Sequence, residues 1–242
     1  MDIKNKSHAK KQRPFCAKVA AEQKSNRPKN RLKKFTYKGA LLMIKKLNNY
    51  QIESRATAQL YTPLDSFTIF TMGTSGEGGE ILDHIKKHVG HGHPLDIKVL
   101  IKESGDGLWY GGRVADLLDL ELGKVWTTAN YTPHLTTYKG SDFSALHHAT
   151  VDTLSLIDCA SANMLKYSRH MLRPGGMDGF NKRMIAAEFV DFISGLKALL
   201  KLYNIDVLEV VKVNAAKLKT RYDGNFSTEA SMARVDVRSE AA

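Results

Sequence analysis

The chain has 242 residues, 43% hydrophobic and 25% charged, a composition typical of a soluble globular protein with one large domain or two small ones. No apolar run approaches the length of a membrane span, so we expect no integral membrane protein. The two cysteines, Cys16 and Cys159, form no disulfide framework or metal-ligand pattern, and they indicate a reducing compartment such as the cytoplasm.

The N-terminal segment carries the positive charge of the chain. Residues 1–46 hold 15 Lys or Arg and two acidic residues, a net charge of +13, whereas the remainder has a net charge of −2. We expect a disordered basic arm over residues 1–40, because this stretch has too few apolar residues to fold alone. The arm either makes weak, salt-dependent contact with nucleic acid or is a solvated tail. It lacks the apolar core of a secretory signal.

The first half of the chain predicts a series of helices. The stretch 50–60 reads as a helix that Pro63 ends, and residues 66–72 lead into a helix with apolar residues at 3–4 spacing. Gly90-His-Gly-His-Pro94 predicts a loop, and Asp96 is the expected N-cap of the next helix. A short helix over 121–130 precedes a loop at 131–145.

The second half predicts three helices over 153–171, 182–203 and 207–222, separated by turn signals at 174–176 and 204–206. Alternation with a period of two residues is not sustained anywhere. The expected fold class is therefore all-α.

Two acidic pairs have i, i+3 spacing, which places both side chains of a pair on one helix face. They are Glu77 with Glu80, and Glu103 with Asp106. A helical hairpin would turn the two faces toward each other. Four converging carboxylates repel unless a cation binds, and an all-oxygen ligand set suits Mg²⁺ or Mn²⁺. Paired acids also occur on solvated helix faces, so spacing alone leaves both interpretations open.

Four glycines lie in or after the second acidic pair: Gly105, Gly107, Gly111 and Gly112. Each weakens a helix by roughly 1 kcal/mol relative to alanine. Tertiary packing must compensate for this cost.

Several segments in order resemble the MazG-like nucleotide pyrophosphohydrolases. They are Leu47-Asn-Asn-Tyr50-Gln51, Gly76-Glu77-Gly-Gly79-Glu80-Ile81, Lys86-Lys87, Lys102-Glu103-Ser-Gly105-Asp106 and Leu108-Trp109-Tyr110. The resemblance implies an antiparallel helical bundle in which the four acids hold Mg²⁺. It implies hydrolysis of nucleoside triphosphates to the monophosphate and pyrophosphate by metal-activated water. Among the four acids we favour Glu80 for orienting that water.

Basic and polar residues are expected to contact the substrate. Lys86 and Lys87 follow the first acidic pair closely, and the resemblance implies that Lys87 and Tyr110 contact the phosphates and the sugar or base. The family ending has an Asn followed by basic residues, which is similar to Asn214, Lys217 and Arg221. The first half has Asn130 in the corresponding place but lacks the basic residues of that ending. The expected substrate-binding residues are therefore Lys86, Lys87, Tyr110, Asn130, Lys217 and Arg221.

The second half repeats the theme of the first at a period of about 84 residues, which predicts tandem domains. We expect a catalytic repeat over 41–146 and a degenerate repeat over 147–242, where Asp158 stands alone and Glu188 and Asp191 are relics. Such repeats predict a pseudo-dimer or a homo-oligomer. Either the second repeat supplies Lys217 and Arg221 to one working site, or these are surface residues beside an inert repeat.

Other residues are weaker candidates. His91 and His93 form a short motif that is more typical of a polar loop than of a transition-metal site. Cys159 is expected to be a small core residue. The alternative function is a non-catalytic nucleotide- or nucleic-acid-binding protein that uses the basic arm.

Overall fold

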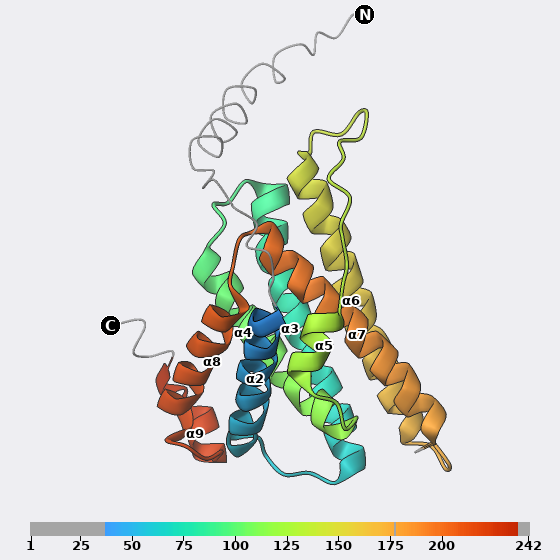
Figure 1. Cartoon of the computed structure of the whole chain (residues 1–242), viewed down its shortest axis with the longest axis vertical. Helices are drawn as coiled ribbons and strands as arrows, with labels where there is room; N and C mark the ends of the chain where they lie inside the picture. Colours follow the sequence, from blue (N-terminus) through green and yellow to red (C-terminus); the bar gives the residue numbers. More distant parts are fainter. Residues whose placement is uncertain (1–36, 177, 237–242) are drawn as a thin grey trace, which may run out of the picture. The chain divides into compact units, whose positions relative to one another are not determined.

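The computed structural model describes residues 37–176 and 178–236, and these residues form helices without any strand (Figure 1). The elements are α2 (Tyr37–Glu53), the 3₁₀ helix η1 (Ser54–Thr57), α3 (Pro63–His91), α4 (Ile97–Leu117), α5 (Leu122–Thr128), α6 (Ala145–Met171), α7 (Gly179–Leu202), α8 (Val207–Tyr222) and α9 (Thr228–Ala233). The expected all-α class is confirmed. Residues 1–36 of the expected arm lie outside the described residues, and residues 37–40 belong to α2.

Local signals explain most helix ends. Asp96 is the N-cap of α4, as expected, and its carboxylate accepts a hydrogen bond of 2.8 Å from the Lys98 backbone N–H. The prediction over 50–60 is wrong in its bounds, because that helix is α2 and it ends at Glu53. Pro63 begins α3, since its fixed φ suits the first turn of a helix and its missing N–H is not needed there.

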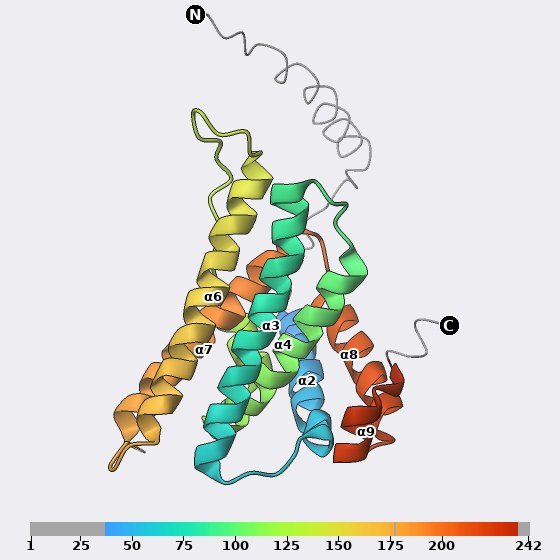
Figure 2. The ribbon, with the colours of Figure 1, turned by 180° about the vertical axis from the view of Figure 1, so that it is seen from behind.

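Two helical hairpins form the centre of the fold. α3 and α4 are joined by the short loop 92–96, and α6 and α7 are joined by residues 172–178, of which 177 lies outside the described residues. The hairpins pack together chiefly through α3 and α6, which lie side by side (Figure 2). Within that interface the buried Thr71 hydroxyl donates a 2.9 Å hydrogen bond to the Ser168 hydroxyl. The helices expected from the two halves of the sequence thus share one interior.

α4 lies at the centre of this packing. It contacts α3, α7 and α8, and most of its residues from Leu100 to Ala115 are buried. A Cβ on Gly107 would lie 3.6 Å from the Phe192 ring, and a Cβ on Gly111 would lie 3.4 Å from the Phe189 ring. Both distances are ordinary van der Waals contacts, so the aromatic side chains of α7 pack on this part of α4 without requiring glycine at either position.

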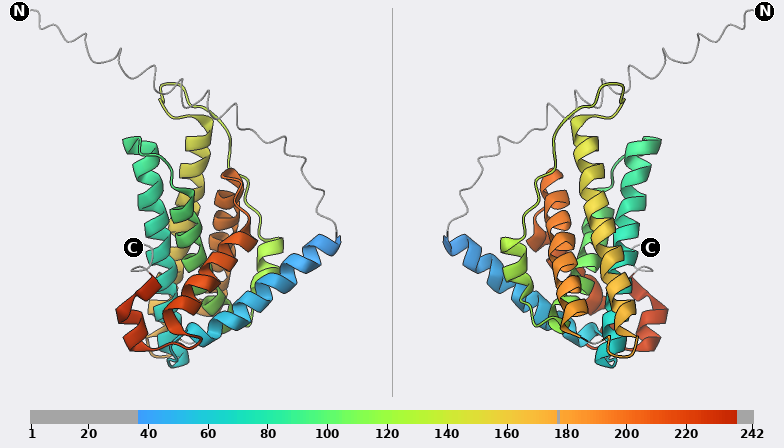
Figure 3. Two further views of the ribbon diagram at one scale, coloured as in Figure 1. Left: turned by 90° about the vertical axis from the view of Figure 1, so that its left-hand side faces the viewer. Right: turned by 90° about the vertical axis from the view of Figure 1, so that its right-hand side faces the viewer.

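The remaining helices cover α4 from other sides. α2 runs obliquely to the hairpins and packs against α5 (Figure 3). The side chain of Gln51 connects them, because its carbonyl accepts a 2.7 Å hydrogen bond from the Leu122 backbone N–H. Within the described range, no helix has the length and hydropathy needed to cross a membrane. Cys159 is exposed on α6, so the expectation that it lies in the core is wrong.

Candidate metal centre

The α3–α4 hairpin brings three of the four expected acids together. The carboxylates of Glu77, Glu80 and Glu103 each offer one oxygen, and these oxygens lie within 4.8 Å of one another. Glu103 is buried at 6% exposure, Glu77 is half-buried and Glu80 is exposed. We refer to these residues as the acidic trio. Its spacing and its all-oxygen chemistry fit a hard divalent cation such as Mg²⁺ or Mn²⁺.

The acidic trio concentrates negative charge in a partly dehydrated place. Burial, followed by the charges of Asp106, Glu80 and Glu103, raises the pKa of Glu77 to about 8. Burial also raises the pKa of Glu103, although Lys102 donates a 3.1 Å hydrogen bond to its carboxylate and counteracts the shift. A bound cation would remove the repulsion that causes part of these shifts, so the electrostatics support the same ligand as the geometry.

Asp106 differs from the other acids because α8 reaches it. Both of its oxygens accept hydrogen bonds from the Lys217 ammonium, and Oδ1 also accepts a 2.6 Å hydrogen bond from the Asn214 amide. The Lys217 and Asp106 side chains are 9% and 19% exposed. The Tyr50 hydroxyl on α2 donates a 2.7 Å hydrogen bond to the Asn214 carbonyl oxygen. Three helices, α2, α4 and α8, therefore meet at this carboxylate.

The close approach of α8 depends on the residue before Asp106. A Cβ on Gly105 would lie only 2.9 Å from the Asn214 Cβ, which is closer than real contacts allow. The absence of a side chain at Gly105 thus lets Asn214 reach Asp106.

The two expected lysines on α3 lie at the edge of the site. Lys86 and Lys87 are exposed and form ion pairs of 2.5 and 2.6 Å with Asp83. Lys87 borders a cavity of about 330 Å³ that also includes two acids of the trio; the lining residues are Gly76, Gly79, Glu80, Asp83, His84, Lys87, Val99 and Glu103. A larger cavity of about 540 Å³ at the α6–α7 turn contains none of the expected site residues.

Tyr110 lies beside the acids on α4 and is half-buried. Burial, followed by the charges of Glu77 and Asp106, raises the pKa of its phenol to about 12. The Tyr222 and Tyr61 phenols, where ionised, raise the pKa of Tyr110 further.

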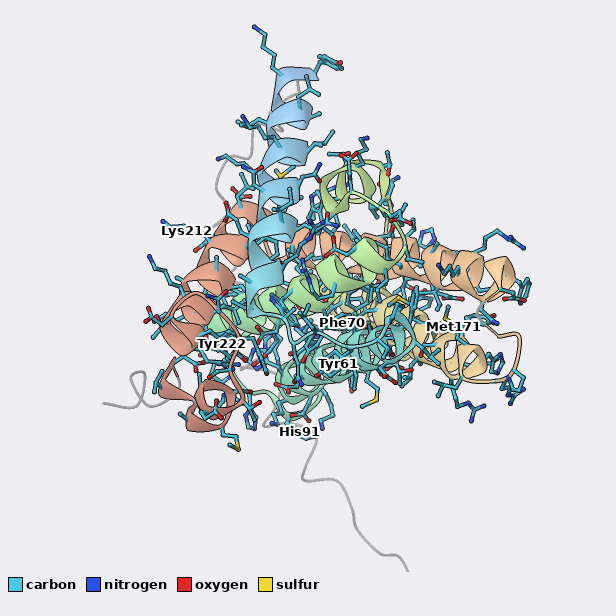
Figure 4. All side chains as sticks on the ribbon, turned by 90° about the horizontal axis from the view of Figure 1, so that it is seen from below. Tyr61, Phe70, His91, Met171, Lys212 and Tyr222 are labelled. Carbon is cyan, nitrogen blue, oxygen red and sulfur yellow. The ribbon has the colours of Figure 1, made fainter. Side chains whose placement is uncertain are left out.

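The tyrosines belong to a larger aromatic group. Phe70 contacts Tyr61 and Trp109 edge-on at centroid distances of 6.2 Å each, and Trp109 contacts Tyr110 at 4.8 Å. Figure 4 shows Tyr61 and Phe70 close together, with Tyr222 on α8. We call Tyr61, Phe70, Trp109, Tyr110 and Tyr222 the aromatic wall. Phe70 is buried in the core and Trp109 packs against it. The rings that can present a face to a nucleobase are therefore those of the exposed Tyr61 and the half-buried Tyr110 and Tyr222.

Two other expected site residues, Arg221 and Asn130, make no hydrogen bond or ion pair with the four acids within the described chain. Arg221 pairs instead with Asp236, with hydrogen bonds of 2.8 and 2.6 Å. Asn130 is exposed just after α5, a helix that packs mainly against α2 and α7. In the second hairpin the Asn163 amide donates a 3.2 Å hydrogen bond to Glu188, and the described residues form no metal-compatible group there.

Sequence reasoning did not assign a role to Asn214 or Tyr50. Asn214 carried a signal, because it precedes Lys217 by three residues and so shares a helix face with it. Tyr50 lies in a segment that carries the family resemblance, but its contact with Asn214 spans 164 residues, so no local pattern indicated its role.

Comparison of the chain with protein-family models, curated proteins and solved structures finds no match in any of the three. The geometry of the site is therefore the basis for proposing a function, and the resemblance to MazG-like enzymes stays a prediction.

Proposed function

We propose that the protein is a MazG-like, Mg²⁺-dependent hydrolase that cleaves nucleoside triphosphates to the monophosphate and pyrophosphate. The observation that carries this proposal is the arrangement around α4. The acidic trio and Tyr110 belong to the α3–α4 hairpin, and the Lys217 ammonium, whose side chain is 9% exposed, reaches Asp106 of the same hairpin from α8. Cation, phosphate and nucleobase each have a chemically suitable partner in that arrangement.

The acids take different roles in this proposal. The acidic trio, together with Asp106, would hold Mg²⁺ or Mn²⁺. A bound cation would lower the pKa of its water ligand and neutralise charge on the phosphate. Glu80 is the exposed member, borders the cavity and accepts no hydrogen bond from the described residues. Its carboxylate is therefore available to orient the attacking water and to take its proton.

The basic residues balance the charge of the triphosphate. Lys217 lies at the acids on a flexible stem, and an ammonium binds phosphate oxygens as a compact charge with three donors. Lys87 borders the cavity and can approach the distal phosphates if it leaves Asp83. Tyr110 stands between the acids and the other aromatic residues, a position that suits a contact with the sugar or base.

The proposal is tested by a panel of standard and modified nucleoside triphosphates assayed for pyrophosphate with Mg²⁺. We expect Glu80→Gln, which removes the group that orients the reacting water, and Asp106→Asn, which removes a proposed metal ligand, each to lower kcat by about 100-fold. Glu53→Gln is the matched control, because Glu53 is an exposed acid outside the site. Equal rates for all three variants would contradict the proposal. Nucleotide binding without pyrophosphate release would support the alternative of a non-catalytic binding protein, which the arm-deleted chain then tests further.

A further inference from the structure

The four acids of the site fall into two groups with different partners. The acidic trio has oxygens close to one another, whereas Asp106 is outside that group and holds Lys217 and Asn214. We propose that a divalent cation binds first to the acidic trio without Asp106. We further propose that the triphosphate then draws Lys217 from Asp106 to its phosphates. This inference rests on the proposed function.

Hydrogen bonding keeps Asp106 from the first cation. A carboxylate has about four lone-pair sites, and Asp106 uses three of them, two for the ammonium and one for the Asn214 amide. An ammonium in direct contact also repels an approaching divalent cation. Among the described residues no ammonium pairs directly with Glu77 or Glu80, although the charge of Lys217 lowers the pKa of Glu77, and Lys102 pairs with Glu103.

The partners of Asp106 differ in how readily they can leave. Asn214 is buried, is fixed by the Tyr50 hydroxyl and lies against Gly105. Lys217 has a four-carbon flexible stem and a point charge, so it can exchange one anionic partner for another without movement of the helix. We infer that Tyr50 and Asn214 are positioning residues, which hold Asp106 in place while Lys217 moves to the phosphate.

The order of binding is tested by titrating the full chain with Mn²⁺ in the absence of nucleotide. The double variant D106N/K217M removes the ion pair without changing net charge, and we expect its Mn²⁺ affinity to stay within about threefold of wild type. E80Q removes a trio ligand, and we expect a loss of at least about 10-fold, as for disrupted metal sites generally. A double variant as weak as E80Q would show that Asp106 is a ligand of the first cation.

A second measurement uses the wild-type chain and so does not depend on the folding of a variant. The ¹⁵N signal of the Lys217 ammonium, assigned by comparison with K217R, reports its partner directly. We expect no shift with Mg²⁺ alone and a clear shift when an α,β-methylene triphosphate analogue is added. A shift with Mg²⁺ alone, or none with the analogue, overturns the proposed exchange.

These outcomes separate the order of binding from the proposed reaction. A chain that shows the expected Mn²⁺ and Lys217 behaviour but releases no pyrophosphate contradicts the hydrolase proposal alone. A wild-type chain that binds no Mn²⁺ contradicts both.

Discussion

Arg221 and Asp236 form an ion pair near the end of the described residues, with side chains 13% and 5% exposed. The hydrogen bonds from Arg221 lower the pKa of Asp236 below its usual value. A carboxyl whose pKa is lower in the folded state stabilises the fold above its unfolded pKa, near 3.9. That contribution is lost as the pH falls through the folded-state pKa. The pair therefore makes the attachment of the C-terminal segment sensitive to acid.

At the residue scale we expect Asp236→Asn to remove this sensitivity. At pH 7 the variant should be less stable by about 2 kcal/mol, the usual cost of breaking a charged hydrogen-bonded pair. The difference in Tm between wild type and variant should shrink as the pH falls from about 5 to below 3, because wild type then loses the same interaction. Thermal denaturation at several pH values measures this. A constant difference would rule out the ion pair as its source.

Lys217 and Arg221 are one turn apart on α8, but they have different partners. We expect Lys217→Ala to lower kcat by about 100-fold, because it removes the charge that in the proposed reaction moves from Asp106 to the phosphates. Arg221→Ala should lower Tm and leave kcat within about threefold, since its guanidinium is bound to Asp236. Lys219→Ala, an exposed lysine of the same helix, is the control for loss of charge. Equal losses of kcat in the Lys217 and Arg221 variants would contradict this division.

At the element scale, the packing of α8 on α4 depends on the small size of Gly105. Gly105→Ala should destabilise the protein by about 1–2 kcal/mol, because the overpacking cost exceeds the gain in helix propensity. It should also lower activity by moving Asn214 and Lys217 from Asp106. Gly90→Ala is the matched control, because a Cβ there meets nothing within 4 Å, and we expect it to raise stability by about 0.5–1 kcal/mol. Differential scanning calorimetry and pyrophosphate release measure both variants, and a stabilising Gly105→Ala would refute the packing argument.

The elements that sequence predicted well are those with local signals. The N-cap at Asp96, the helix 207–222 and the i, i+3 acids all follow from neighbouring residues, and the hairpin brings Glu77, Glu80 and Glu103 together as expected. The ion pair of Lys217 with Asp106 could not be predicted from the spacing of residues along a helix, since it joins residues 111 apart in the sequence.

Hydrogen bonds from side chains of one helix to the ends of another could not be predicted from the sequence either. Gln51 binds the first N–H of α5, and Lys197 donates to the carbonyls of Trp126 and Ala129 at the other end of that helix. These contacts depend on how the helices pack, which the linear pattern does not show.

At the scale of the whole molecule, the two halves of the chain share one core. α3 packs on α6 and α4 packs on α7 and α8, so neither half can bury its apolar faces alone. The segment that joins the halves, residues 129–144, is non-helical and mostly exposed. The packing between the two halves therefore contributes more to the stability of the fold than the covalent link through residues 129–144.

We expect the chain to survive a cut in this segment. With a specific protease site inserted between Lys139 and Gly140, the cleaved halves should co-elute in gel filtration and keep pyrophosphate release within about threefold of the uncut protein. The same halves, expressed separately, should not fold. Halves that separate without denaturant would show that the interface is weaker than its burial indicates.

The pairing of Tyr50 with Asn214 and of Asp106 with Lys217 also has a consequence for how the protein is made. A ribosome adds about 5–20 residues per second, so Lys217 is synthesised roughly 5 to 20 seconds after Asp106. During that interval the nascent chain contains all four acids without the ammonium of α8. Because the first half cannot bury its apolar faces alone, its four acids are not assembled during that interval, and the acidic trio forms only when the second half packs against α3 and α4. The Lys217 ammonium would therefore be present at Asp106 before any divalent cation finds a complete site.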